Sequence, residues 1–315
     1  MEFQHLIARL DPDLQALVRT DVALRELTTL QVGGPAALLC PIHNPVQAVR
    51  FQALARETGL PVFILGGGSN VLADDRGFGG VVLQVRDSHY ERVGEVVSSG
   101  AGHDFDALIA RTLADGLTGL EFASGIPGTV GGAVMGNAGC YGHEIGEFVV
   151  DATVLTPDGE VRTVGPAAFG FRYRETDLRE TGNVLLGVRL RLARGDLAAA
   201  TAERDEHIAD RRRKHPVDLP SAGSWFRNLP PAAPGERRRA AGVLLEQVGA
   251  KEFREGDARV FARHANMIVN AGQATSADVL RLAERMRAAV RDRFGVELVP
   301  EVRYLGGNNP RLPSI

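Results

Sequence analysis

The chain has 315 residues, of which 44% are hydrophobic and 24% are charged. Its 36 basic and 39 acidic residues leave a net charge of −3, which gives no general electrostatic attraction to nucleic acid or to an anionic membrane. The chain is too long to fold around one ordinary hydrophobic core, so we expect two or three subdomains that share a cleft. Because clefts suit small ligands, we expect a small molecule as partner.

The cysteines and the start of the chain indicate the compartment. Cys40 and Cys140 lie too far apart in sequence to suggest a disulfide framework or a metal site. The start MEFQHLIARLDPDLQALV has acidic residues where a secretory signal needs a basic end and an apolar block. No later stretch approaches about 18 consecutive apolar residues, the length of a membrane span. We therefore expect a cytoplasmic protein.

The first ninety residues alternate between apolar segments and a helix, which is typical of an α/β arrangement. Asn44 is placed to cap a helix over 45–59, and Pro45 suits its first turn. The helix face expected in the core is formed by Val46, Val49 and Ala53. The strands expected here are 36–40, 61–65 and 80–85.

A second α+β unit is expected between 95 and 192, with a helix near 104–115 and short strands at 95–100, 148–156, 161–164 and 183–192. A polar helix should run from 196 to 214, because Pro216 forbids its continuation. Thr275 and Asp278 have capping-box spacing before a helix at 276–294. Its core face is expected to contain Val279, Leu282, Ala283, Met286, Ala289 and Val290. The remaining expected elements are a helix at 237–249 and strands at 267–270 and 296–306.

Two glycine-rich passages carry the strongest local signal. The first, LGGGSNVL at 65–72, follows an apolar strand, and successive N–H groups in such a loop can form a nest for phosphate oxygens. The second, at 124–142, is longer than a hairpin needs. Neither matches the dinucleotide fingerprint or a P-loop. The residues alone leave a phosphate site and a flexible turn equally open, although two separate cradles suit a long cofactor.

A series of motifs then extends in order through nearly the whole chain: TTLQVGGPA, LGGGSNVL, SGIPGTVGGAV, NAGCYG, FRYRET, RRKHP, SAGSWFRN, AGVLLEQVGAK, RHANMIVN and VPEVRYLG. This series resembles the UDP-N-acetylenolpyruvoylglucosamine reductase family. The resemblance implies an α+β protein with a vanillyl-alcohol-oxidase-like FAD-binding fold of two α+β subdomains, followed by a C-terminal α+β substrate-binding subdomain. We expect boundaries at 1–82, with 295–315 returning to this part, at 83–214 and at 215–294.

The resemblance also implies an activity. Members reduce UDP-N-acetylglucosamine enolpyruvate to UDP-N-acetylmuramate in peptidoglycan precursor synthesis, with noncovalent FAD as cofactor and NADPH as hydride donor. The partner is then this UDP-sugar, with no nucleic acid or membrane, and we expect a monomer. After Tyr173 and Arg174 the chain reaches the next strand quickly, so it resembles the shorter subtype, which lacks an inserted loop with a tyrosine.

Site residues follow from the same resemblance. Arg174, Ser224 and Glu301 match the catalytic arginine, the proton-donating serine and the catalytic carboxyl group. The cofactor-binding positions are Val32, Gly66, Gly67, Gly68, Ser69, Asn70, Gly125, Ile126, Pro127, Gly128, Asn137 and Gly139. The substrate-binding positions are Lys214, Asn228 and Gln247, and no metal site is expected.

Local sequence alone favours ordinary roles for the three catalytic candidates: a surface arginine, a turn or cap serine, and a solvent-facing strand glutamate. Two other functions remain open from the residues. One is an oxidase or dehydrogenase of the same flavin fold with another substrate, and the other is a flavin or nucleotide sensor without catalysis.

Overall fold

The computed structural model describes residues 3–231, 233 and 235–306. Within them the chain forms two compact units. Unit 1 comprises Met1–Thr20, Leu38–Gly67 and Gly80–Asp210; unit 2 comprises Asp21–Ala37, Gly68–Gly79 and Arg211–Ile315. Two short pieces of the first 82 residues thus belong with the C-terminal third. The expected division into three functional subdomains stays a prediction.

The helices have the following bounds: α1 (Gln4–Ile7), α2 (Pro12–Gln15), α3 (Pro45–Thr58), α4 (Phe105–Ala114), α5 (Val130–Met135), α6 (Leu197–Lys214), α7 (Ala241–Gln247) and α8 (Ser276–Phe294). The first strands are β1 (Arg19–Ala23), β2 (Pro35–Ile42), β3 (Val62–Leu65), β4 (Val71–Ala73), β5 (Phe78–Val85), β6 (Tyr90–Val93), β7 (Val96–Gly100), β8 (Gly139–Cys140) and β9 (His143–Glu144). The later strands are β10 (Val149–Leu155), β11 (Val161–Val164), β12 (Val184–Arg191), β13 (Ser221–Ser224), β14 (Arg254–Glu255), β15 (Ala258–Phe261), β16 (His264–Asn270) and β17 (Arg303–Leu305). None of the helices in the described ranges is both long and apolar enough to cross a bilayer.

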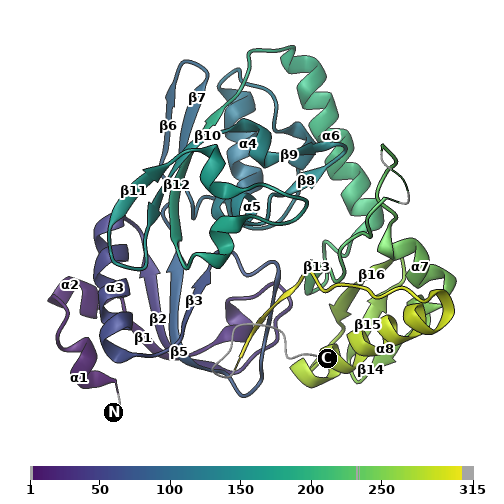
Figure 1. Ribbon diagram of the computed structural model, residues 1–315, viewed down its shortest axis with the longest axis horizontal. Helices are drawn as coiled ribbons and strands as arrows, with labels where there is room; N and C mark the ends of the chain where they lie inside the picture. Colours follow the sequence, from purple (N-terminus) through teal and green to yellow (C-terminus); the bar gives the residue numbers. More distant parts are fainter. Residues whose placement is uncertain (1–2, 232, 234, 307–315) are drawn as a thin grey trace. The chain divides into compact units, whose positions relative to one another are not determined.

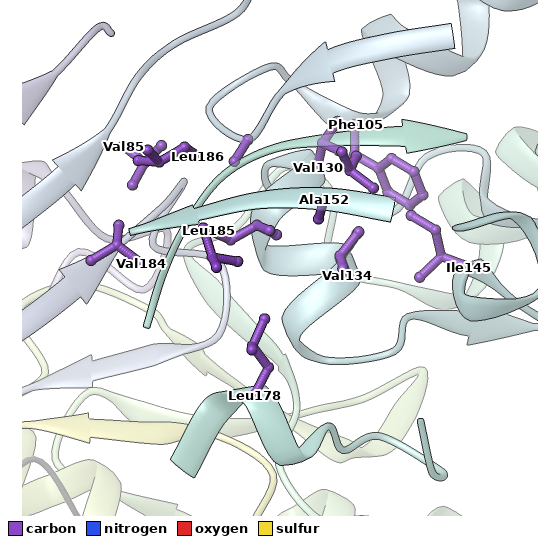
Figure 2. Close-up of a cluster of buried hydrophobic side chains, with 14 of the residues drawn as sticks. Val85, Phe105, Val130, Val134, Ile145, Ala152, Leu178, Val184, Leu185 and Leu186 are labelled. Atoms are coloured by element: carbon purple, nitrogen blue, oxygen red, sulfur yellow. The ribbon is translucent and has the colours of Figure 1, made fainter. Parts of the chain in front are cut away.

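Unit 1 is built on a five-stranded antiparallel sheet in the order β11–β10–β12–β7–β6. Helices α4 and α5 lie against one face of this sheet (Figure 1). The strands β2, β5 and β3 belong to a second sheet of order β1–β2–β5–β3, in which β3 and β5 run parallel. One apolar core joins side chains of these elements, and Figure 2 shows the part between α4, α5, β10 and β12.

Unit 2 contains the four-stranded sheet β13–β16–β15–β14, against which α7 and α8 pack (Figure 1). Ala265 and Ile268 of β16 join one face of α8 in a core, whereas Met267 and Val269 form a separate cluster with Phe261. A separate parallel pair joins β17 to β4, with Arg303 opposite Val71. The C-terminal strand therefore pairs with a segment of the first 82 residues.

Helix ends follow the predicted capping residues. The Asn44 side chain accepts a hydrogen bond from the Gln47 N–H, and α3 ends before Gly59, which is left-handed with φ +64°. Helix α8 spans 276–294 as predicted, with the capping box between Thr275 and Asp278. Two predictions were too long: α7 covers only Ala241–Gln247, and the final strand is limited to Arg303–Leu305.

The predicted core face of α3 was wrong for Val46, which is 70% exposed, whereas Val49 and Ala53 are half-buried and Val49 packs against the core. The face that enters the core carries Ala48, Phe51 and Ala55 instead. Phe51 buries more apolar area than a valine does, so its position sets the rotation of the helix. On α8 the prediction was correct for Val279, Leu282, Ala283, Met286 and Val290, whereas Ala289 is half-buried.

A buried carboxylate stabilises the junction of β4 and β17. Asp74 accepts hydrogen bonds from the Arg76 guanidinium at 2.7 and 3.1 Å and from the Tyr304 hydroxyl. The Arg76 hydrogen bond is the main cause that lowers the pKa of Asp74 to about 2, and burial opposes it. Ionised Asp74 therefore stabilises the folded state above its ordinary pKa of 3.8, and this contribution disappears as the pH falls through about 2.

We predict that Asp74→Asn lowers the free energy of unfolding at neutral pH and that its difference from the parent shrinks between about pH 4 and pH 2. Urea unfolding at a series of pH values measures this difference. Arg76→Ala removes the main cause of the pKa shift and should reduce the same pH dependence. Parallel stability profiles for the parent and Asp74→Asn across this range would contradict the assignment.

Candidate active site

Both glycine passages meet in unit 1. A methyl group added to Gly66 would lie 2.5 Å from Thr129 Oγ1, and one added to Gly67 would lie 3.1 Å from the Gly128 Cα. Any larger side chain in the first passage would therefore separate it from the second. The two glycine passages therefore pack closely against each other at Gly66 and Gly67, and their role as a cradle for phosphate stays a prediction.

Gly68, the third glycine of the first passage, belongs to unit 2. Its φ is +67°, and an added Cβ would lie 2.1 Å from the Leu27 carbonyl oxygen. Glycine is thus required here both for the backbone conformation and for the close approach. The Thr29 N–H donates to the Gly68 carbonyl at 3.2 Å, which fixes the end of the glycine run.

Thr29 also reaches the strand that carries the candidate serine. Its hydroxyl donates to the Ser221 carbonyl at 2.7 Å, and the Ser221 N–H donates to the Thr29 carbonyl at 3.1 Å. Sequence reasoning missed this threonine, although it belongs to the motif TTLQVGGPA. Nothing in the sequence around Thr29 indicates a contact with Ser221, which lies 192 positions away.

The second glycine passage is fixed at its start by an ion pair. The Gly125 N–H donates to Asp106 Oδ1 at 2.8 Å, and the Arg204 guanidinium donates to both oxygens of the same carboxylate at 3.0 Å. The Gly128 carbonyl accepts from the Phe105 N–H at 3.0 Å. Between these two points Ile126 is half-buried and Pro127 is exposed. The turn therefore offers main chain and small side chains on a fixed frame.

Asn137 and Gly139 lie further along this passage. Asn137 is only 1% exposed, and its side chain donates to Glu144 Oε2 at 2.5 Å and to the Arg172 carbonyl at 3.0 Å. Its Oδ1 accepts from the Gly146 N–H at 3.1 Å. The cofactor contact expected for Asn137 stays a prediction, whereas the visible role of the amide is to hold neighbouring loops. Gly139 pairs with Glu144 in the hairpin of β8 and β9.

Arg174 occupies a tight turn in unit 1. The Arg172 N–H donates to the Glu175 carbonyl at 2.9 Å, and the Glu175 N–H donates back at 3.0 Å. Arg174 itself has φ +58°, a left-handed conformation that is unfavourable for a residue with a Cβ. The buried Thr176 hydroxyl donates to the Met135 carbonyl at 3.0 Å and fixes the chain after the turn. Such strain is typical of functional positions.

Ser224 lies at the end of β13 in unit 2, beside a β-bulge. Ser221 is opposite Val269 and Ser224 is opposite Met267, so one strand has an extra residue. Gly223 has φ +77° within this stretch. Because a bulge re-aims the side chain that follows it, the half-buried Ser224 leaves the ordinary alternation of the strand.

Glu301 is joined to the same stretch by main-chain hydrogen bonds. The Glu301 N–H donates to the Trp225 carbonyl at 2.8 Å, and the Glu301 carbonyl accepts from the Asn70 side-chain amide at 3.2 Å. The Arg303 N–H donates to the Asn70 carbonyl at 3.0 Å. Unit 2 therefore brings together three predicted site residues, Asn70, Ser224 and Glu301. Ser69, beside Asn70, is half-buried.

The other predicted residues of unit 2 lie at separate elements. Val32 is 2% exposed, and its side chain belongs to the core. Lys214 is exposed at the end of α6, and Gln247 is exposed at the end of α7. Asn228 Oδ1 accepts from the Ala241 N–H at 3.2 Å and so holds the start of α7.

His264 lies near this stretch but needs no catalytic role. Burial is the main cause that lowers its pKa, which favours the neutral ring. Its Nδ1 accepts from the Asn266 N–H at 3.3 Å, a bond that a protonated Nδ1 could not form. Among the side chains that the structure describes, no group of three His, Cys, Asp or Glu could hold a metal ion.

Comparison with known proteins identifies the family. Residues 215–305 match the C-terminal domain of UDP-N-acetylenolpyruvoylglucosamine reductase, and residues 35–165 match an FAD binding domain. UDP-N-acetylenolpyruvoylglucosamine reductase 2 of Symbiobacterium thermophilum is 40% identical over 94% of this chain and 94% of its own. The chain belongs to the UDP-N-acetylenolpyruvoylglucosamine reductase family.

Other members agree with this assignment. The reductase of Moorella thermoacetica is 38% identical over 97% of this chain and 99% of its own. The crystal structure of the Thermus caldophilus reductase superposes with a TM-score of 0.76 at 33% identity, over 92% of this chain and all of that one. The predicted α+β flavoprotein fold is therefore confirmed.

FAD is the cofactor of this family's fold, and the glycine surface fits it. Added Cβ atoms at Gly66, Gly67 and Gly68 would each meet a neighbour at 3.1 Å or less, so this stretch presents main chain rather than side chains. Exposed main-chain N–H groups suit a diphosphate.

We predict that Gly67→Val releases FAD, because the new side chain would separate the two glycine passages and cover the main chain. The ratio of bound flavin to protein after gel filtration measures the effect. Gly165→Val is the matched control, since an added Cβ there meets no atom within 4 Å. Full flavin content in Gly67→Val would remove this surface from the cofactor site.

A second variant separates the two roles considered for Asn137. Asn137→Ala leaves the half-buried Gly146 N–H without its side-chain acceptor and removes one of the two donors to the Arg172 carbonyl, which keeps the Glu175 N–H. Each lost hydrogen bond costs about 0.5–1.5 kcal/mol. We predict a lower free energy of unfolding in urea with flavin content unchanged. Loss of flavin at unchanged stability would instead support the cofactor contact.

Proposed function

We propose that this chain reduces UDP-N-acetylglucosamine enolpyruvate to UDP-N-acetylmuramate with NADPH, a step of peptidoglycan precursor synthesis. Family membership over most of the chain supports this activity. The observation that carries the proposal for the site is the 2.8 Å main-chain bond between Glu301 and Trp225, which places Glu301 beside the Ser224 stretch. An acid and a hydroxyl on neighbouring segments suit the delivery of a proton.

The reaction determines which groups are needed. When bound, FAD relays a hydride from NADPH to the enolpyruvyl group. Addition of hydride to the terminal carbon of a vinyl group conjugated to a carboxylate leaves negative charge on the neighbouring carbon and on the carboxylate. The protein must stabilise this charge and then protonate the carbon.

Arg174 supplies the positive charge in this proposal. A guanidinium stays protonated throughout the reaction, and its fork pairs with both oxygens of a carboxylate. The left-handed turn and the hydrogen bonds on either side of it hold the Arg174 main chain before substrate arrives. Preorganised charge of this kind stabilises a developing anion without reorganisation.

Ser224 supplies the proton to carbon. Serine is a weak acid, but the basic enolate accepts its proton if nearby charged groups keep the resulting alkoxide transient. Glu301 assists by polarising the enolate or by returning a proton to the serine oxygen. Both residues are attached to one hydrogen-bonded main-chain frame, which supports their joint action.

The remaining site residues bind the two nucleotides. Gly66, Gly67, Gly68, Ser69 and Asn70 would cradle the FAD diphosphate. The main chain and small side chains of Val32, Gly125, Ile126, Pro127, Gly128, Asn137 and Gly139 would contact the rest of the cofactor. Lys214, Asn228 and Gln247 would bind the UDP-sugar, with the lysine neutralising part of its diphosphate.

The proposal also includes a monomeric, cytoplasmic enzyme of the shorter subtype. The Arg172–Glu175 turn leads directly into a short 3₁₀ helix, Asp177–Glu180, and then into β12 at Val184. This course is consistent with the absence of an inserted tyrosine loop. Sedimentation analysis of the holoenzyme tests the monomer.

We predict that Ser224→Ala separates the two half-reactions, because only the second needs a proton delivered to carbon. Stopped-flow absorbance should show normal flavin reduction by NADPH, whereas reoxidation by the enolpyruvate substrate should slow by about 10²–10⁴-fold, the usual contribution of a general acid. Ser224→Cys should recover part of the rate.

The same measurements test the rival functions. An oxidase or dehydrogenase of this fold would not be reoxidised by the enolpyruvate, and a sensor would not be bleached by NADPH. Reoxidation of Ser224→Ala at the parent's rate would make Ser224 a turn residue, and the proton would then come from Glu301 or from water.

A further inference from the structure

The side chain of Asn266, on β16, acts as an additional peptide group beside the candidate serine. Its Oδ1 accepts from the Phe226 N–H at 2.9 Å, and its Nδ2 donates to the Phe226 carbonyl at 2.8 Å. The Asn266 carbonyl accepts from the Trp225 N–H at 2.7 Å. One residue thus satisfies three of the four main-chain groups of Trp225 and Phe226, the two residues that follow Ser224.

These contacts replace a strand pairing that has ended. Regular pairing of β13 with β16 stops at Ser224 and Met267, immediately after the bulge (Figure 1). The chain nevertheless continues into the core, where Trp225 is 1% and Phe226 is 2% exposed. Buried main-chain groups at this point need partners, and the Asn266 amide supplies them.

The far side of the same stretch holds Glu301. The Trp225 carbonyl accepts from the Glu301 N–H, and Phe226 forms an isolated bridge with Pro300. The segment 224–226 is therefore held by Asn266 on one side and by the segment 299–301 on the other. Any displacement of 224–226 would move Ser224 and Glu301 together.

We propose that Asn266 is a positioning residue that sets the place of Ser224 and Glu301, an inference that rests on the function proposed above. Asparagine suits this role because its short side chain presents one acceptor and one donor in the geometry of a peptide. Aspartate keeps the acceptor but sets a carboxylate against the Phe226 carbonyl, and alanine offers neither group. Asn266 is itself 3% exposed and so acts through Phe226 rather than by contact with solvent.

A purely structural role is the alternative, and the chain offers a matched control. Asn270 lies on the same strand and is 5% exposed. Its Oδ1 accepts from the Gly272 and Ala274 N–H groups, both at 3.0 Å, and its Nδ2 donates to the Leu30 carbonyl. Asn270→Ala therefore removes a comparable buried amide whose side-chain bonds involve neither Ser224 nor Phe226.

The experiment compares Asn266→Ala, Asn266→Asp and Asn270→Ala as FAD-loaded enzymes. Because a misplacement near 1 Å can cost about 10²-fold, we expect Asn266→Ala to slow reoxidation by the enolpyruvate substrate by about 10–10²-fold. Reduction by NADPH should stay at the parent's rate. Asn270→Ala should lose similar stability in urea and keep both rates. If Asn266→Ala does not fold, the nearly isosteric Asn266→Asp should show the same selective loss.

Trp225 provides a second readout that is independent of activity, since it is the chain's one tryptophan. The main-chain bond from the Trp225 N–H to the Asn266 carbonyl stays in Asn266→Ala, but the adjacent Phe226 loses both of its bonds to the Asn266 side chain. Acrylamide quenching of Trp225 fluorescence should therefore rise in Asn266→Ala and stay at the parent's level in Asn270→Ala.

Three outcomes would overturn the inference: parental reoxidation in both Asn266 variants, equal slowing in Asn270→Ala, or unchanged quenching of Trp225. Ser224→Ala, measured alongside, distinguishes failure of the positioning role of Asn266 from failure of the function proposed for Ser224. If Ser224→Ala slows reoxidation and the Asn266 variants do not, the positioning role fails alone. If Ser224→Ala itself has no effect, the function proposed for Ser224 fails first.

Discussion

The bond from the Glu301 N–H to the Trp225 carbonyl is the interaction on which the unit 2 part of the candidate site depends. It joins a segment near residue 300 to a strand near residue 224, and Asn70 joins the first of these to the loop near residue 70. Three parts of the chain that are distant in sequence thus share one hydrogen-bonded frame. The bond between Glu301 and Trp225 is made by main chain alone, so it fixes position and leaves both side chains available for other contacts.

Close main-chain approach has the same function in unit 1. The glycines near 66 and 128 pack against each other because they have no side chains, and Asn137 bonds to the chain beside the Arg174 turn. The strained residue is held from both sides, by the Asn137 contact to Arg172 and by the Thr176 contact to Met135. Rigidity around a strained arginine is what a preorganised charge requires.

Residues with a local physical signature were predictable from the sequence. The capping box and the apolar periodicity together defined α8, and both its ends were correct. Periodicity failed for Val46 on α3, because the larger apolar residues Phe51 and Leu54 are the ones that become buried and so determine the rotation of the helix. The glycine loops were recognisable because a cluster of glycines indicates positive φ angles or close approach of the main chain.

The supporting residues could not be predicted in the same way. Asn266 and Thr29 act through main-chain groups of partners 40 and 192 positions away, so neither has a local signature. For Asn266, the only sequence signal of a supporting role was a side-chain amide within the largely apolar motif RHANMIVN. A buried amide of that kind must find partners, but the sequence does not say which ones.

Unit 2 is assembled from three separate parts of the chain, and this affects the order in which its elements can fold during synthesis. Strand β4 pairs only with β17 in the two-stranded sheet that they form, so its partner is synthesised more than 200 positions later. Contacts of such sequence separation form late, because loop closure must precede them. On the ribosome, β4 therefore remains without its strand partner until synthesis has passed Leu305. Unit 1 ends at Asp210, so its segments do not have to wait for the last hundred residues before they can pack together.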